Sequence, residues 1–211
     1  EAPSGAAVRA MIGPMLTAYA EWITAEAGKL PSEPGRRGVG EKLLANATRA
    51  KIRIQAGLDA LDDPHIFEAF RIANRASATA IRQRACHDKP ELTPEALAPP
   101  TWYPFQLAFL LMNIVGMAHP DHAEHQIVDL LFFPTGGGKT EAYLGLAAFA
   151  MVLRRLRDPS VQSAGLSVLM RYTLRLLTLD QLGRAATLVC ALELERQENV
   201  EKLGRWPFEI G

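Results

Sequence analysis

The sequence is poor in cysteine and carries no excess of charge of either sign. Its 211 residues include two cysteines, Cys86 and Cys190, which are far apart and lack CxxC spacing. This argues against a disulfide framework or a zinc site, so we expect a reducing, cytoplasmic setting. Lysine and arginine total 23, as do aspartate and glutamate. The total charge therefore identifies no partner, and a surface for nucleic acid must be a local patch.

Long apolar runs are missing as well. The most apolar window, residues 107–117, is too short to span a bilayer, so we expect no membrane association. No basic region followed by an apolar run stands at the start, so we expect no signal peptide. The first residue is glutamate, not methionine, and the last follows a strand-like segment. We therefore expect the sequence to be a fragment of a longer protein.

The first 98 residues show helical patterns separated by turn signals. Apolar residues recur at intervals of three and four over 6–30, and similar patterns predict helices over 41–61 and 64–86. Residues 31–40, rich in proline and glycine, predict an exposed loop. Residues 88–101 contain four prolines and predict a linker to a different unit. We expect residues 1–98 to form a helical N-terminal region.

Beyond the linker, strand-like and helical segments alternate. Residues 105–117 predict a buried helix, and residues 126–133 form an apolar run typical of a strand buried in a parallel sheet. A helix over 141–156, a second strand near 167–170 and a helix over 177–196 complete the predicted order. This order is typical of the α/β class. We expect residues 99–211 to form the first half of a RecA-like P-loop NTPase lobe.

A glycine-rich segment between the first predicted strand and its helix gives the strongest functional signal. It reads Pro134-Thr135-Gly136-Gly137-Gly138-Lys139-Thr140. Glycines let the backbone approach phosphate oxygens, and the N-terminus of the following helix adds aligned N–H donors. We predict that Lys139 reaches the β- and γ-phosphates of ATP and that the Thr140 hydroxyl ligates Mg²⁺. These two residues are the candidate catalytic groups, and the alternative is an ordinary glycine-rich turn.

Three further residues are candidates for the nucleotide site. Gln106 precedes the glycine segment, and its amide is suited to donate to and accept from the edge of adenine. Tyr103 is a candidate to stack on the base, while the alternative is that the neighbouring aromatic residues anchor a buried helix. Glu141 is a candidate to place the metal or water, or it stands there because a carboxylate complements the helix dipole.

Residues 167–181 hold candidate contacts to a DNA backbone. Hydroxyl, guanidinium and amide groups contact phosphodiesters without reading sequence. The alternative for Arg171 and Arg175 is that they lie on a solvent-exposed face of a helix and contact no DNA. The histidines at 119, 122 and 125 are interpreted as part of a solvated loop and not as a metal site. The candidate DNA-binding residues are Arg171, Thr173, Arg175, Thr178 and Gln181.

Two segments, residues 133–147 and 170–179, resemble the DrmA-type helicase of the DISARM bacterial phage-defence system, a superfamily 2 helicase. Residues 67–74 and 104–109 are also similar to that family. The resemblance runs from about residue 60 onward. It implies a DNA motor that binds DNA, works with a DrmB-type partner subunit and restricts phage DNA. It also implies that Gly136, Gly138, Lys139 and Thr140 form motif I and that residues 171–181 correspond to motif Ia.

The sequence lacks the acidic Asp-Glu-x-His or Asp-Glu-x-Asp motif that such motors use for hydrolysis, and it lacks a second lobe. We expect these parts to lie beyond Gly211. The leading hypothesis is an ATP-dependent DNA helicase or translocase. An alternative is a P-loop ATPase that acts as a nucleotide-gated switch or remodeller without unwinding DNA. In a third hypothesis the helical region over 1–98 is a docking module for partner proteins.

Overall fold

The structure is a computed structural model, and it describes all residues except 1, 88, 90, 133, 135 and 172–174. For residues 175–178 it describes the backbone and not the side chains. Every regular element in the described part is a helix. The α-helices are α1 (Gly5–Ala27), α2 (Pro34–Ala60), α3 (Pro64–His87), α4 (Pro104–Ala118), α5 (Lys139–Arg157), α6 (Arg175–Glu198) and α7 (Val200–Leu203). Short 3₁₀ helices are η1 (Pro94–Ala96), η2 (Ala123–Gln126) and η3 (Val161–Ala164).

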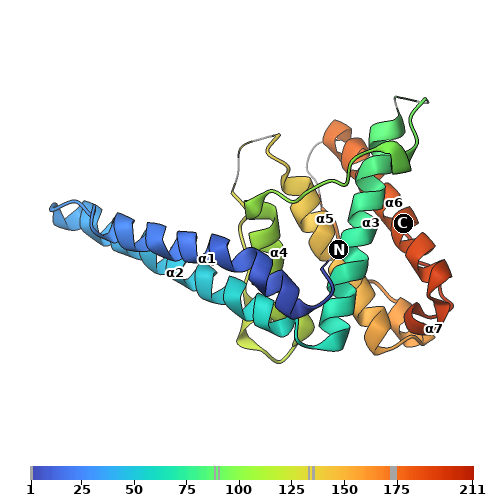
Figure 1. Ribbon diagram of the computed structural model, residues 1–211, viewed down its shortest axis with the longest axis horizontal. Coiled ribbons are helices and arrows are strands. Elements are labelled where there is room, and N and C mark those ends of the chain that lie inside the picture. The colour runs from blue at the N-terminus through green and yellow to red at the C-terminus, as the bar shows by residue number, and fades with distance from the viewer. Residues whose placement is uncertain (1, 88, 90, 133, 135, 172–174) are drawn as a thin grey trace.

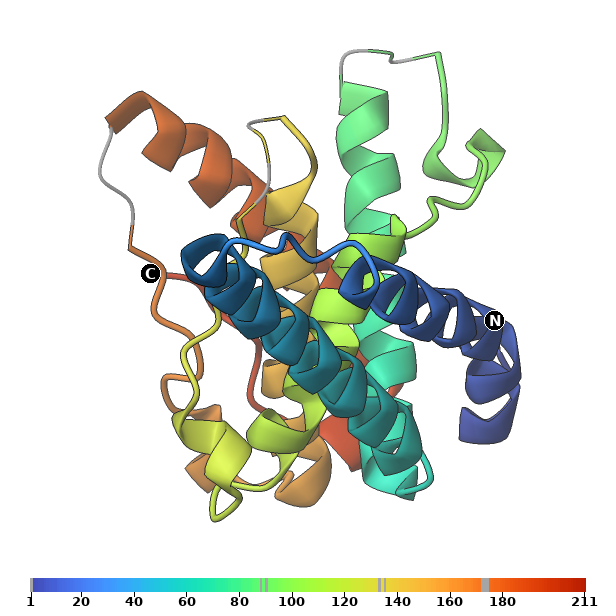
Figure 2. The same cartoon turned by 90° about the vertical axis from the view of Figure 1, so that its left-hand side faces the viewer.

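Helices α1 and α2 form a long antiparallel hairpin that projects from the rest of the protein (Figure 1). Seen from the side of the hairpin, α2 crosses in front of α4, and α3 and α5 stand behind (Figure 2). In the body, α3 packs against α5 and α6, while α4 lies between α2 and α5. This arrangement places the N-terminal ends of α4 and α5 beside the C-terminal half of α3.

One hydrophobic cluster joins these helices. Ile72 on α3, Leu110 on α4, Phe149 on α5 and Leu192 on α6 are each at most 1% exposed. Burying a side chain of this size stabilises the fold by roughly 1.5 to 3 kcal/mol. The cluster draws on residues from both sides of position 98. The division of the chain into regions 1–98 and 99–211 stays a prediction, but the two parts share this core.

The predicted α/β fold is wrong, because no described residue belongs to a strand and the structure has no parallel sheet and no RecA-like lobe. The segment over 127–132 is extended, but no described neighbour forms a backbone ladder with it. Its alternate residues Val128, Leu130 and Phe132 are 95%, 87% and 90% exposed. Asp129 points the other way and forms a bidentate ion pair with Arg53 of α2.

The second predicted strand also lacks a ladder. Residues 166–170 are irregular, and Leu166 and Leu169 are 79% and 84% exposed. The guanidinium of Arg154 on α5 donates to the backbone oxygen of Leu166 at 2.8 Å, so a side chain supplies the hydrogen bond that a neighbouring strand would give. An apolar run is compatible with an extended backbone, but a sheet also needs a partner strand.

Most helix predictions are confirmed to within three residues at each end, and one turn prediction is wrong. The predicted loop over 31–40 is mostly helical, since α2 begins at Pro34. Proline is favoured in the first turn of a helix, where its missing N–H is not needed. The exposed Arg37–Glu41 pair, four residues apart, gives the start of α2 further support. The glycines of this segment were therefore misinterpreted as breakers.

Among the described residues, no helix is both long and apolar enough to span a membrane.

Candidate functional site

The glycine segment forms a turn that leads directly into α5. Gly136 and Gly138 adopt left-handed backbone angles, with φ of 82° and 83°. Between them, the Gly137 N–H donates to the Pro134 oxygen at 3.1 Å. Gly138 is the N-cap of α5 and provides no side-chain cap, so the first N–H groups of the helix have no acceptor from that side chain. These donors and the helix dipole favour an anion at this end.

Lys139 and Thr140 are the first two residues of α5, as the sequence predicts. The Lys139 ammonium donates to the Pro134 oxygen at 2.9 Å and so lies across the turn. The Thr140 hydroxyl lies 3.2 Å from the Tyr143 hydroxyl. A cation, a hydroxyl and the N–H groups of a helix N-terminus at one place fit a phosphate group with a bound Mg²⁺. Of the predicted nucleotide contacts, Thr135 lies outside the described residues.

Gln106 joins α4 to the glycine turn. Its side chain is 4% exposed, its Oε1 accepts from the Tyr103 N–H at 2.8 Å, and its Nε2 donates to the Gly138 oxygen at 2.7 Å. A Cβ atom added at Gly138 would lie only 2.6 Å from that Nε2. The structure therefore places Gln106 against the turn itself. Its predicted contact with adenine stays a prediction, but holding the turn is a role that the structure shows.

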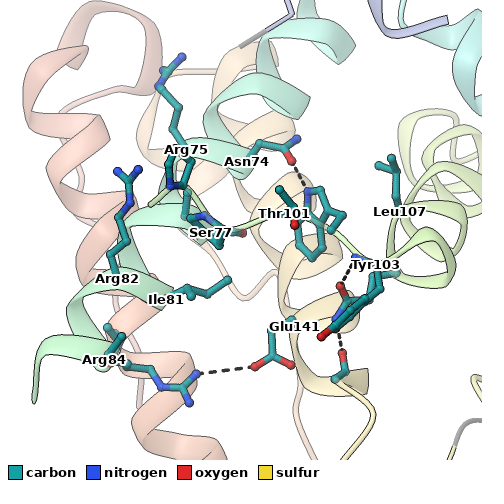
Figure 3. A pocket seen from close by; sticks show the side chains of 18 of the residues that line it. Asn74, Arg75, Ser77, Ile81, Arg82, Arg84, Thr101, Tyr103, Leu107 and Glu141 are labelled. Carbon is teal, nitrogen blue, oxygen red and sulfur yellow. Dashed lines mark hydrogen bonds and ion pairs between the residues drawn. The ribbon is translucent and has the colours of Figure 1, made fainter. Parts of the chain in front are cut away.

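A cavity of about 1490 Å³ opens beside the turn (Figure 3). Gly138 and Gln106 line it, together with residues of α1, α3, α6 and the segment before α4. Tyr103, at the start of α4, is 64% exposed and stacks on Phe105 with ring centroids 6.3 Å apart. Tyr103 thus lines the cavity with a largely accessible ring, as stacking on a base requires.

Glu141 lines the cavity and forms ion pairs with two arginines. Its carboxylate lies 2.8 Å from the Arg184 guanidinium of α6 and 3.8 Å from that of Arg84 on α3 (Figure 3). Arg184 also pairs with Asp180 at 2.8 Å. Glu141 therefore connects the beginning of α5 to two neighbouring helices. This contact supports a structural role for Glu141 in addition to its place near the positive end of the helix dipole.

Sequence reasoning missed the contribution of α3 to the cavity. Arg71, Arg75 and Arg82 line it, as does Ser77, which is 7% exposed and whose hydroxyl has no hydrogen-bond partner among the described residues. Asn74 accepts a hydrogen bond from the Trp102 indole at 2.5 Å and so fixes the segment before α4. The signal in the sequence was the spacing of the three arginines, because intervals of four and seven residues place them on one helix face.

The predicted DNA contacts are only partly described. Arg171 is exposed, while Thr173 and the side chains of Arg175 and Thr178 lie outside the described residues. Gln181, on α6, lies against α5: its Oε1 accepts a hydrogen bond from the Tyr143 hydroxyl at 2.7 Å. The structure therefore connects Gln181 to Thr140 through Tyr143, and contact with DNA stays a prediction for all five residues.

The histidine-bearing loop forms no metal site in the described part of the chain, where no group of three metal-ligating side chains occurs. His125 contacts the Gly116 oxygen through Nδ1 at 2.8 Å, and His122 accepts from the Glu124 N–H at 3.1 Å. Both contacts secure the loop that follows α4.

The described residues thus form a helical protein in which a glycine turn and the N-terminus of α5, suited to an anion, adjoin a cavity. It is similar to the DISARM protein DrmA of Bacillus paralicheniformis (strain ATCC 9945a / NCIMB 11709 / CD-2), with 36% identity over 209 residues. The match covers 92% of this chain but 18% of that protein. This similarity supports the DrmA-like resemblance. A scan against protein families finds no match.

Proposed function

We propose that the protein binds ATP and Mg²⁺ through the glycine turn and belongs to an ATP-driven DNA helicase or translocase of a phage-defence system. The observation that carries the proposal is the pair of left-handed glycines, Gly136 and Gly138, leading straight into α5 with Lys139 and Thr140 in its first turn. Phosphate binding requires this combination of a tight glycine turn, a helix N-terminus, a cation and a hydroxyl.

The cavity supplies room for the rest of the nucleotide. Phosphates at the glycine turn leave the ribose and base to extend past Gly138 into the space beside Tyr103 and Gln106. The Tyr103 ring is accessible for stacking, and one N–H of the Gln106 amide is not used by its bond to Gly138. Mg²⁺, held by Thr140, would neutralise phosphate charge.

The similarity to the DISARM protein DrmA supports the role in defence against phage. Through it we propose DNA and a DrmB-like protein as partners, with Arg171 and the segment up to Gln181 facing the DNA backbone. Hydrolysis also needs acidic groups that activate water and hold the metal, so turnover is a property of the intact protein.

The test is ATP hydrolysis by the intact protein, with and without DNA. We expect single- or double-stranded DNA to raise the rate, and we expect Lys139→Ala to abolish turnover while circular dichroism stays unchanged, because Lys139 is not in the core. Wild-type hydrolysis in Lys139→Ala would contradict the assignment. A rate that neither form of DNA changes would contradict a DNA motor and favour a nucleotide-gated switch.

The projecting hairpin supports a second role as a docking module. Large apolar side chains lie open on it, with Met11 71%, Trp22 50% and Leu43 65% exposed. Because these side chains contribute little to the core, replacing Trp22 and Leu43 by serine tests docking without unfolding the body. Loss of a protein partner with DNA binding intact supports the module. Unchanged association with every partner of the intact complex contradicts it.

A further inference from the structure

A chain of hydroxyl and amide groups connects the beginning of α5 to α6. The Tyr143 hydroxyl lies 3.2 Å from Thr140 Oγ1 and 2.7 Å from Gln181 Oε1. Tyr143 is half-buried and packs against the hydrophobic core, so its ring is held in place. Tyr143 therefore connects the Thr140 hydroxyl, in the first turn of α5, to Gln181 on α6.

The direction of each hydrogen bond follows from the donors available. The Gln181 Nε2 lies 3.3 Å from Asp180 Oδ2, which places the amide oxygen toward Tyr143. That oxygen can only accept, so the single phenol hydrogen of Tyr143 is donated to it. Tyr143 Oη then accepts from the Thr140 hydroxyl. The chain runs from Thr140 through Tyr143 to Gln181.

This direction has a consequence for the Thr140 oxygen. A neutral hydroxyl binds a cation through a lone pair, and its hydrogen must point elsewhere. Without a fixed acceptor, a threonine in a helix can turn its hydroxyl toward a backbone carbonyl in the preceding turn. The Tyr143 oxygen supplies a fixed acceptor, and hydrogen bonds in series strengthen one another when the first donor is polarised.

We propose that Tyr143 is a positioning residue that orients the Thr140 hydroxyl toward Mg²⁺, and that Gln181 holds Tyr143 in that role. The proposal rests on the proposed function, because it concerns the metal bound with ATP. It assigns to Gln181 of α6 an effect on the metal site that passes through Tyr143. Since coupling between sites is reciprocal, bound Mg²⁺ also favours the position of Gln181 seen here.

The test is the binding of a fluorescent ATP analogue to the intact protein, measured with Mg²⁺ and with a chelator. Tyr143→Phe keeps the ring and removes the hydroxyl. We expect it to weaken binding in Mg²⁺ by about 3- to 10-fold, the range of one lost hydrogen bond, and to leave binding in chelator unchanged. Gln181→Met, which keeps the length of the side chain, shows a smaller loss of the same kind.

Tyr19→Phe is the matched control, because Tyr19 lies on α1 and stacks on Trp22. We expect Tyr19→Phe to leave the affinity for the analogue unchanged, both with Mg²⁺ and with the chelator. Equal weakening of Tyr143→Phe with and without Mg²⁺ would show a packing role and overturn the proposal, as would wild-type affinity in both conditions. If the unaltered protein binds the analogue in neither condition, the proposed nucleotide function itself falls. If Tyr143→Phe is misfolded by circular dichroism, the Mg²⁺ dependence of Gln181→Met decides in the same way.

Discussion

The contact between Gln106 and the glycine turn predicts different costs for alanine at two glycines with the same backbone angle. Gly136 and Gly138 have φ of 82° and 83°, so alanine is strained equally at both, by about 1 to 2 kcal/mol. A Cβ at Gly136 meets no atom of the described residues within 4 Å, whereas a Cβ at Gly138 would lie 2.6 Å from Gln106 Nε2. Gln106 must then move and give up its buried hydrogen bonds, which adds about 1 to 2 kcal/mol.

We therefore expect Gly136→Ala to lower the free energy of unfolding by about 1 to 2 kcal/mol and Gly138→Ala to lower it by roughly 2 to 4 kcal/mol. Urea denaturation followed by circular dichroism measures both. The entropy that alanine removes from the unfolded chain is the same in the two variants and cancels in the comparison. In a Gln106→Ala background the two substitutions should cost the same. Equal costs in the presence of Gln106 would refute the contact.

Three other perturbations follow from ion pairs of the structure. Arg53, 8% exposed, pairs with Asp129 and Glu124, so Arg53→Met leaves two carboxylates without a cation and should cost about 3 kcal/mol in urea denaturation. Glu141→Gln removes partly exposed ion pairs and should lower the free energy of unfolding by only about 1 kcal/mol or less in the same assay. A loss as large as that of Arg53→Met would contradict the expectation that the Glu141 pairs contribute less than the Arg53 pairs. Hydrogen bonds from Arg196 lower the pKa of the Glu193 carboxyl to about 2, from 4.5 for the free group. The ionised Glu193 therefore stabilises the fold at pH values above about 4.5, and this contribution is lost as the pH falls toward 2. Glu193→Gln should therefore remove about 2 kcal/mol of the acid-dependent part of stability, and an unchanged pH profile would contradict that pKa.

The helices were predictable because their signals are local. Apolar spacing of three and four identified α1, α3, α4, α5 and α6, and the glycine segment stood immediately before α5 as expected. The sheet was not predictable from such signals. Apolar runs at 126–133 and 167–170 fit buried strands, but a strand exists only when another chain segment forms its ladder. In the described structure Val128 and Leu169 are instead largely exposed.

The candidate site was predictable where one short segment forms it. Gly136, Gly138, Lys139 and Thr140 lie together because they are consecutive or nearly so. Tertiary contacts decided the rest: Gln106 reaches Gly138 across 32 positions of sequence, and Tyr143 reaches Gln181 across 38. No local pattern encodes such distances. The arginine face of α3 was visible as spacing, but only the packing of α3 beside the glycine turn gives that face a relation to the site.

The most direct test of the central claim is equilibrium binding of ATP, with Mg²⁺, to the unaltered protein and to Lys139→Ala. The account predicts binding by the unaltered protein and a loss of at least about 10-fold in Lys139→Ala, because a charged hydrogen bond to phosphate is removed. Lys29→Ala is the control, since Lys29 pairs with Glu26 at the tip of the hairpin, and it should bind normally. No binding by the unaltered protein, or equal binding by Lys139→Ala, would contradict the claim that this turn holds the phosphates of ATP.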